Sequence, residues 1–388
     1  MTAGASDAGV RVRLPTLLRE WGRIGCIGFG GPPTHIALLR ELCVHKRRWL
    51  DEQDFEDAIA ACNLLPGPAS TQLAIYCAWR LRGRIGALLG GIAFILPGLL
   101  LIIALAALFL ASAPPRWLLG AGAGAGAAVA AVAVHAGWTL APASWQRAAR
   151  GSRLRWAIYV LAGGTAAATI GPWLVLVLVG CGAVEVVLQR AAPLSGTFAA
   201  APLVAVAGAS GGLLALAWVA FKVGALSYGG GFVIIPLMQA DAVSHYHWMT
   251  AGQFLNAVAL GQVTPGPVVQ TVAVVGYAAA GIGGALVAAL VAFSPSFAFI
   301  LVGGQRFDLI RRDVRARAFL DGAGPAAIGA ILGSAIPLAR ALQESWQCGV
   351  LATAALTLLL LRRGVVATLL LAGAAGTIVA LAGGPLPH

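Results

Sequence analysis

One set of motifs occurs twice in this chain, and each second copy lies 199 residues after its counterpart (224 − 25 = 199). The pairs are Gly25 and Gly224, Phe29-Gly30-Gly31 and Tyr228-Gly229-Gly230, Trp49 and Trp248, Phe55 and Phe254, and Pro66-Gly67-Pro68 and Pro265-Gly266-Pro267. Glycine and proline interrupt helices, so both copies are broken at corresponding places. Matching breaks in two homologous halves are typical of secondary transporters, whose binding site lies where the breaks meet. The duplication therefore predicts a transporter and the position of its site.

The composition is that of a membrane protein. Hydrophobic residues make up 59% of the chain and charged residues 10%, with a mean hydropathy of +0.87, whereas a soluble domain carries about 25% charged residues. Apolar runs such as 85–112 are long enough to cross a hydrocarbon layer of roughly 30 Å. Alternating strands of about ten residues are absent. We therefore predict an all-α polytopic membrane protein with roughly 10–12 membrane segments.

The net charge of +12 and the six cysteines support narrower conclusions. The basic residues lie in short loops between apolar runs, so they indicate membrane topology and we expect no nucleic-acid partner. The cysteines form no CxxC pair, which favours small buried hydrophobic side chains over metal or redox chemistry. Residues 1–13 lack the apolar core of a secretory signal, so we expect no cleaved signal peptide.

The chain divides into two domains, residues 1–195 and 196–388, joined by a segment of small residues around 191–212. Each domain contains six hydrophobic elements, which we expect to be helical. In the first domain they span roughly 14–44, 55–80, 84–112, 117–141, 155–170 and 172–189. In the second they span roughly 213–238, 254–279, 283–303, 319–342, 346–361 and 364–384.

Loop charge indicates that the two halves are inverted. Arginine and lysine residues flank the 55–80 element on both sides, whereas the corresponding loops, 239–253 and 279–283, contain neither. By the positive-inside rule the first pair of loops is cytoplasmic and the second pair external. Further clusters at 147–155, 306–317 and 362–363 mark cytoplasmic loops, and the C-terminus is placed outside. The side of the N-terminus stays open.

A helical element with both ends on one side of the membrane does not span it. We therefore expect the 55–80 and 254–279 elements to be re-entrant hairpins, turned at Pro66-Gly67-Pro68 and Pro265-Gly266-Pro267. Irregular backbone at this depth is tolerated only when it is buried in protein or lines a cavity. The alternative is a single kinked helix that spans the membrane.

Arg23 and Lys222 occupy the same position in the two copies, two residues before Gly25 and Gly224. A cation within a membrane segment is costly unless it faces a cavity or a partner, so both are candidate substrate-binding residues. Two cations that meet across the axis of an inverted repeat would form an anion site. Alternatively, each side chain reaches the head groups, and this explanation is weaker for Lys222 because it follows an apolar run.

Backbone and amide groups near the breaks are further candidate substrate ligands. Gly30, Gly31, Gly229 and Gly230 interrupt their helices, and freed amides at the start of a half-helix can bind anions. Close helix packing is the alternative for these glycines. Asn63 and Gln262 are repeat equivalents three residues before each turn, and Thr264 flanks the second turn. The amides could orient an oxyanion or bond the opened backbone.

The remaining polar residues indicate no catalytic centre. Glu185 stands alone in an apolar run and could carry a proton, or pair with Arg190 or with a residue that the sequence does not identify. Metal-ligand spacing is absent around His35, His135, His245 and His247, and nucleotide-binding and hydrolase motifs are missing. We therefore expect no enzyme activity, no cofactor and no bound metal. Transport should depend on an ion gradient or on the membrane potential.

These motifs together resemble the chromate ion transporter (CHR) superfamily in its long-chain, two-domain form. The resemblance rests on both duplicated sets in order and covers nearly the whole chain. They include Phe29-Gly30-Gly31-Pro32, Leu65-Pro66-Gly67-Pro68, Lys222-Val223-Gly224, Gln262-Val263-Thr264-Pro265-Gly266-Pro267 and Gly276-Tyr277. Where the second half has Gly231-Phe232, the first has Pro32-Pro33, so the two half-sites are unequal.

The resemblance implies chromate efflux across the bacterial inner membrane, chromate resistance, and an antiparallel arrangement of the halves. Chromate itself comes from the resemblance alone. Sulfate or another oxyanion remains an alternative substrate, because both ions are tetrahedral dianions that expose only acceptor oxygens. An intramembrane enzyme acting on a lipid phosphate is the alternative of another class, and the breaks offer no nucleophile for it. The lipid bilayer is the expected environment, and the chain could form a homodimer.

Overall fold

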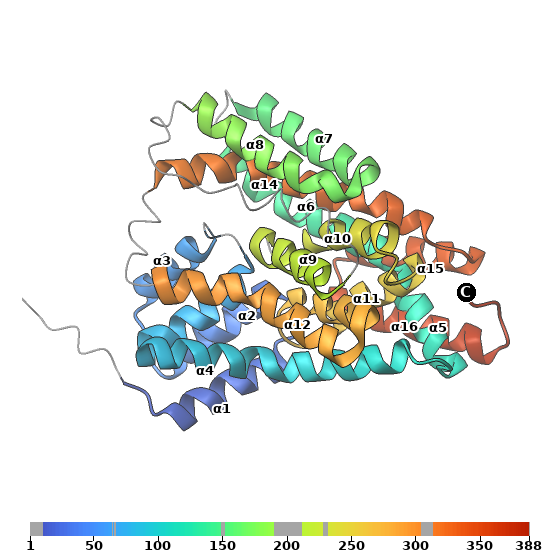
Figure 1. Ribbon diagram of the computed structural model, residues 1–388, viewed down its shortest axis with the longest axis horizontal. Helices are drawn as coiled ribbons and strands as arrows, with labels where there is room; N and C mark the ends of the chain where they lie inside the picture. The colour runs from blue at the N-terminus through green and yellow to red at the C-terminus, as the bar shows by residue number, and fades with distance from the viewer. Residues whose placement is uncertain are drawn as a thin grey trace, which may run out of the picture.

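A computed structural model describes residues 11–63, 65, 67–148, 152–189, 212–227, 232–303 and 313–387. Most of these residues are helical, and no strand occurs among them (Figure 1). The first half contains α1 (Leu14–Ile27), α2 (Pro32–Arg40), the π-helix η1 (Glu41–Lys46), α3 (Glu52–Cys62), α4 (Ala69–Phe109), α5 (Arg116–Ala127), α6 (Val129–Arg147), α7 (Arg153–Thr169), η3 (Gly171–Trp173) and α8 (Leu174–Leu188). The second contains α9 (Leu213–Leu226), α10 (Ile234–Gln239), η5 (Ala240–His245), α11 (Ala251–Val263), η6 (Val268–Gln270), α12 (Thr271–Gly303), α14 (Val314–Arg340), α15 (Ser345–Ala355), η8 (Leu356–Leu360) and α16 (Val365–Leu381).

The helices of the two halves correspond in order. The bounds of α1 and α9 are 199 residues apart at both ends, and each half continues with a short helix, a π-helical turn and a helix that ends before the Pro-Gly-Pro motif. One long helix, α14, takes the place of α5 and α6. Equivalent contacts recur as well. Gly25 packs against the carbonyl oxygen of Phe94, and Gly224 packs against that of Ala292. The sequence repeat is therefore also a structural repeat.

Both predicted Pro-Gly-Pro turns separate helices. In the first half α3 ends at Cys62 and α4 begins at Ala69, and in the second α11 ends at Val263 and η6 begins at Val268. The predicted break at Gly28–Gly31 is also present, because α1 ends before it and α2 begins at Pro32. The second-half residues Tyr228, Gly229, Gly230 and Gly231, the Pro66 of the first turn, and most of the predicted linker 191–212 lie outside the described residues.

The 55–80 element has the geometry of a hairpin. Arg82 and Gly83 depart from helical dihedrals within α4, and Gly83 has a φ of 62°. After this kink the chain folds back, because Gly86 packs against the carbonyl oxygen of Ala78. The segment 69–81 alone would be about 20 Å long, shorter than the hydrocarbon layer.

An ion pair joins the two ends of this hairpin, since Arg80 Nη2 lies 3.0 Å from Asp54 Oδ2 at the start of α3. The second half repeats the kink at Ala280 and Gly281, where Gly276 packs against Gly284. These contacts favour hairpins over single kinked helices, and the membrane face that each hairpin meets stays a prediction.

The two halves exchange helices. In Figure 1, α7 and α8 of the first half lie along α14 of the second, and the extensive α14 contacts with both confirm this. Reciprocally, α16 of the second half packs along α5 of the first. Glycine allows both approaches, because a Cβ at Gly163 would collide with the Ala326 carbonyl and a Cβ at Gly376 with that of Gly120. Neither half therefore forms a separate globule.

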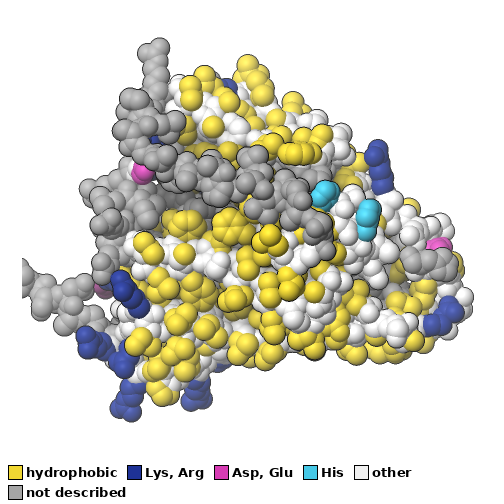
Figure 2. Space-filling view, in the orientation of Figure 1, with side chains coloured by type: hydrophobic (Ala, Val, Ile, Leu, Met, Phe, Trp, Pro, Cys, Tyr) yellow, Lys and Arg dark blue, Asp and Glu magenta, His cyan; other side chains and the backbone are white. Residues whose placement is uncertain are grey.

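The described helices have the length and surface of membrane segments. Four regions are long and apolar enough to cross a membrane: Ala69–Phe109, Arg116–Arg147, Val268–Gly303 and Val314–Arg340. On the face that Figure 2 shows, hydrophobic side chains cover the middle of the molecule, and most Lys and Arg side chains lie toward the two ends of the long axis. This distribution is expected of a membrane protein whose middle surface contacts the lipid acyl chains.

Candidate functional site

The Pro-Gly-Pro turn of each half lies against the first helix of the other half. The Gly266 amide of the second turn donates a hydrogen bond of 3.0 Å to the Gly28 carbonyl, which ends α1. Reciprocally, Gly67 of the first turn lies beside the backbone of α9, where a Cβ would be 3.2 Å from the Gly224 carbonyl oxygen. The predicted meeting of the breaks is therefore present for the second turn and the end of α1, whereas the second-half break at Tyr228–Gly231 lies outside the described residues. We call the region around these contacts the crossing.

The backbone of each turn depends on its central glycine. Gly67 has a φ of 120° and Gly266 a φ of 97°, which side chains with a Cβ rarely adopt. The turns lead directly into α4 and η6, and no side chain caps either helix start. Uncapped amides at a helix start carry partial positive charge, which favours an anion. The crossing therefore presents backbone donors from both halves.

Buried polar groups without a hydrogen-bond partner surround the turns. Within the described part of the chain these atoms are Thr71 Oγ1, Ser227 Oγ, Gln262 Nε2, Gln270 Oε1 and Ser296 Oγ. All five residues are at least nine-tenths buried. Such groups are costly unless something bonds them. Three hydroxyls and one amide NH₂ are donors that oxyanion oxygens accept, so the crossing has the donor set of an anion site.

His35 links the end of α1 to the start of α4 at the crossing, and it was not among the site residues expected from the sequence. Its Nε2 lies 2.9 Å from the Gly28 carbonyl oxygen, and its Nδ1 lies 3.3 Å from Ser70 Oγ at the start of α4. The side chain is fully buried. Its position four residues after Gly31 was a usable signal, because it places a polar ring one turn into the helix that follows the break.

The equivalent amides Asn63 and Gln262 have different environments. Gln262 is buried, whereas Asn63 is exposed and lines a cavity of about 840 Å³. The second-half helix α11 packs on α5, where Asn256 contacts Gly122 and Gly126. The repeat equivalents of these two helices are α3 of the first half and α14 of the second, and both line the cavity. The helix pair α11 and α5 is therefore packed closed, whereas the equivalent pair α3 and α14 borders an open cavity.

The cavity lies between the ends of α3, α6, α7, α8 and α14. Among its charged residues are Arg147, Arg155 and Arg317, together with Glu185 and Asp321; the other lining residues are Ala60, Asn63, Ser144, Ala148, Ser152, Trp156, Tyr159, Gln189, Leu320 and Pro325. Arginines from the two segments predicted to be cytoplasmic, 147–155 and 306–317, therefore meet in one cavity that also reaches Asn63, three residues before Pro66.

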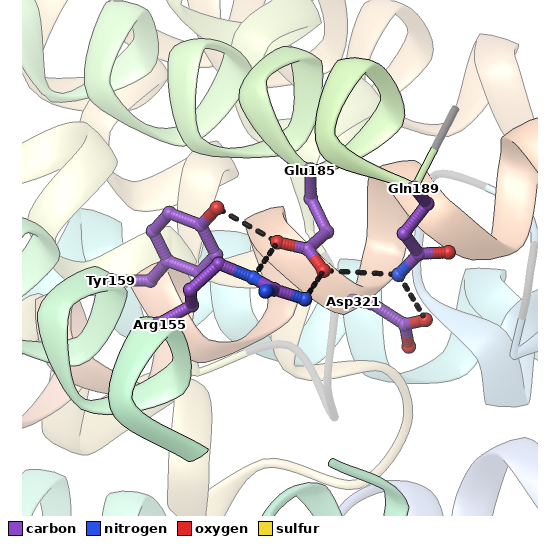
Figure 3. A network of polar contacts seen from close by, with 5 residues as sticks. All are labelled: Arg155, Tyr159, Glu185, Gln189 and Asp321. Atoms are coloured by element: carbon purple, nitrogen blue, oxygen red, sulfur yellow. Dashed lines mark hydrogen bonds and ion pairs between the residues drawn. The ribbon is translucent and has the colours of Figure 1, made fainter. Parts of the chain in front are cut away.

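A network of hydrogen bonds forms one wall of this cavity (Figure 3). Arg155 binds Glu185 through two parallel bonds, Nε to Oε2 and Nη2 to Oε1, each 3.0 Å. The Tyr159 hydroxyl donates to Oε2 at 2.8 Å, and Gln189 Nε2 donates to Oε1 at 3.0 Å and to Asp321 at 3.3 Å. The cation that pairs with Glu185 is thus Arg155, and Arg190 lies outside the described residues.

The predicted cation pair has two dissimilar environments. The Arg23 side chain is 56% exposed and lies 3.9 Å from Glu20, which fits the head-group alternative. Lys222 is buried, forms an ion pair with Asp241 and lies over the Trp218 ring at 5.9 Å. No described contact joins Arg23 to Lys222, so the paired-cation site stays a prediction.

The other candidate ligands lie near the crossing to different degrees. Gly30 and Gly31 have positive φ, 96° and 75°, and a Cβ at Gly31 would be 3.4 Å from Val268 beside the second turn. The hydroxyl of Thr264 donates to Leu260 within its own helix, so it is already bonded. Pro68, Pro265 and Pro267 are buried in the turns. Pro66, Gly229 and Gly230 lie outside the described residues.

Comparisons with known proteins identify relatives over the whole chain. The family model described as "Chromate transporter" matches residues 15–186 and 214–377. A chromate transport protein of Cupriavidus metallidurans is 33% identical over all of this chain and 97% of the relative. One from Pseudomonas aeruginosa is 32% identical over 85% of this chain and 82% of the relative. An uncharacterized transporter of Methanocaldococcus jannaschii is 27% identical over 75% of this chain and 76% of the relative. No solved structure matches.

Proposed function

Because the chain belongs to the chromate transporter family, we propose that it is a secondary transporter that exports chromate across the bacterial inner membrane and confers chromate resistance. The proposal rests on the structure of the crossing. There, each Pro-Gly-Pro turn lies against the first helix of the opposite half, and buried hydroxyl and amide groups lack partners in the described residues. This is the arrangement expected of a substrate site between transporter repeats.

The ion binds at the crossing through neutral donors. Backbone amides at the starts of α4 and η6 and the hydroxyls of Thr71, Ser227 and Ser296 take its oxygens. Neutral donors leave the bound dianion with its charge, so the membrane potential acts on the loaded site. In a cell that is negative inside, the potential favours export by about 2.3 kcal/mol per charge per 100 mV, and about twice that for a dianion.

The unequal states of the two halves support alternating access between inverted repeats. Asn63, three residues before the first turn, lines the cavity, while the equivalent Gln262 before the second turn is buried. With cytoplasmic arginines at the cavity, this conformation faces inward. In the outward conformation α3 would close on α14 as α11 closes on α5 here, and α11 would separate from α5. Export follows when chromate enters the first conformation and leaves the second.

Everted membrane vesicles test the function. They should accumulate radiolabelled chromate when the interior is made positive, and excess sulfate should be added to measure competition. The site is tested with Ser296→Ala, which removes a buried hydroxyl without a described partner and should raise the KM for chromate about tenfold. Ser294→Ala is the matched control, because Ser294 lies on the same helix but is exposed.

Two results would contradict the proposal. Vesicles that take up none of chromate, sulfate, molybdate and phosphate would show that the chain does not transport oxyanions. Equal KM values for both serine variants would remove the hydroxyl of Ser296 from the site. Uptake of sulfate in preference to chromate would retain the mechanism and change the substrate.

A further inference from the structure

The cavity beside the first turn is large enough to admit a hydrated oxyanion. Its volume of about 840 Å³ lies in the range of small-molecule sites, roughly 300–1,000 Å³, and well above the size of a tetrahedral ion. Three arginines and two acids line it, so its charged side chains carry a net positive charge. An anion from the cytoplasm would be attracted to the cavity and could reach Asn63 at the end of α3.

The Glu185 carboxylate occupies a donor set that also suits an oxyanion. It accepts four hydrogen bonds: two from the Arg155 guanidinium, one from Tyr159 and one from Gln189. A guanidinium with two parallel donors matches two oxygens of a carboxylate or of a tetrahedral oxyanion equally well. Glu185 is 2% exposed, whereas the Arg155 side chain is 36% exposed and lines the cavity. Of the two partners, the arginine is therefore the more accessible to an ion in the cavity.

We propose that Arg155 is a cytoplasmic binding site for the oxyanion and that Glu185 competes with the ion for its guanidinium. The inference rests on the proposed transport function and concerns a second site, separate from the crossing. When an oxyanion binds, Arg155 turns from Glu185 to the ion. Tyr159 and Gln189 still donate to the carboxylate, so the displaced acid keeps two of its four bonds. When the ion moves on to the crossing, Glu185 takes the guanidinium back and thereby assists release.

The competition predicts opposite effects for the two partners. Glu185→Gln removes the competing charge, so the KM for chromate should fall severalfold and release from the cavity should slow. Arg155→Gln removes the ion's main ligand, so the KM should rise about tenfold. Transport at saturating chromate should persist in both, since the crossing is unchanged. Arg155→Lys retains the charge without the planar fork and should give an intermediate KM.

Chromate uptake by everted vesicles gives the KM values, and two controls separate this site from a purely structural ion pair. The double variant Arg155→Gln/Glu185→Gln restores neutrality; it should be as stable as the wild type and keep the raised KM of Arg155→Gln. If the pair is only structural, the double variant regains the wild-type KM. Arg116→Gln is the matched arginine control, because Arg116 is exposed and bonds the Gly384 carbonyl near the C-terminus.

Direct binding provides an independent readout in the purified protein. Chromate should quench the fluorescence of Trp156, which lines the cavity, and the quenching should be reduced in Arg155→Gln. A Trp156→Phe variant identifies this contribution among the 11 tryptophans. A KM that rises or stays constant in Glu185→Gln, or quenching that does not depend on Arg155, would overturn the inference. Absence of transport by the wild type would instead overturn the proposed function.

Discussion

Lys222 and Asp241 form a buried ion pair that can be tested as a stability element and as a substrate site in one experiment. Their side chains are 6% and 4% exposed, so either charge alone would be left in a nonpolar environment. Removal of one partner from such a pair costs about 3–5 kcal/mol, whereas replacement of both is often close to neutral. We therefore expect Lys222→Met and Asp241→Asn each to be strongly destabilising. The double variant should recover most of the loss.

Thermal unfolding of the purified protein, followed by tryptophan fluorescence, measures these differences. Membrane proteins often unfold irreversibly, so all variants must be heated at one rate in one detergent. Arg23→Gln is the control, because the Arg23 side chain is 56% exposed and should affect the midpoint little. Single variants as stable as the wild type, or a double variant as unstable as either single variant, would refute the argument.

Transport by the double variant then decides the role of Lys222. If its charge only balances Asp241, the folded double variant should export chromate with a normal KM. If Lys222 contacts the ion, as the repeat position predicts, the double variant should fold and fail to transport. The structure favours the first result, because the ammonium already pairs with Asp241.

Three further predictions test the fold. Cysteines in place of Arg48 and Arg80 should both react with an impermeant reagent from the cytoplasmic side, because the two ends of the first hairpin lie together. Labelling of the two positions from opposite faces would instead support a single helix that spans the membrane. Gly266→Ala should destabilise the protein by about 1–3 kcal/mol, because its φ of 97° is unfavourable for alanine, and an unchanged unfolding midpoint would exclude this strain. Gly163→Val should lower folded yield, because the new side chain meets the Ala326 carbonyl, while Gly283→Ala, with open space around it, should not.

The local breaks and the hairpins could be predicted from the sequence. Proline and glycine act on their own backbone, so the turn at Gly67 and the end of α1 before Gly28 follow from residue type. The ion pair of Arg80 with Asp54 agrees with the loop charges that placed both ends of the hairpin on one side. These features depend on short stretches of chain.

The site residues were harder to predict because burial and pairing depend on distant segments. Arg23 and Lys222 share a repeat position, yet only Lys222 has an acid, Asp241, packed against it. The partner of Glu185 is Arg155, which lies 30 residues away on a neighbouring helix. His35 contacts Gly28 across the irregular backbone between α1 and α2, and no periodic pattern in the sequence predicts such a contact.

The sequence by itself determined that this is a helical membrane protein of two homologous halves, because hydropathy and a repeat with one constant offset depend only on the order of the residues. Only the tertiary structure decided how the halves combine. It showed α7 and α8 on α14, α16 on α5, and each turn against the first helix of the opposite half. It also showed Asn63 at a cavity and Gln262 buried. Chemically similar residues in corresponding positions acquire different environments because packing between halves, unlike local backbone preference, is set by the conformation of the whole molecule.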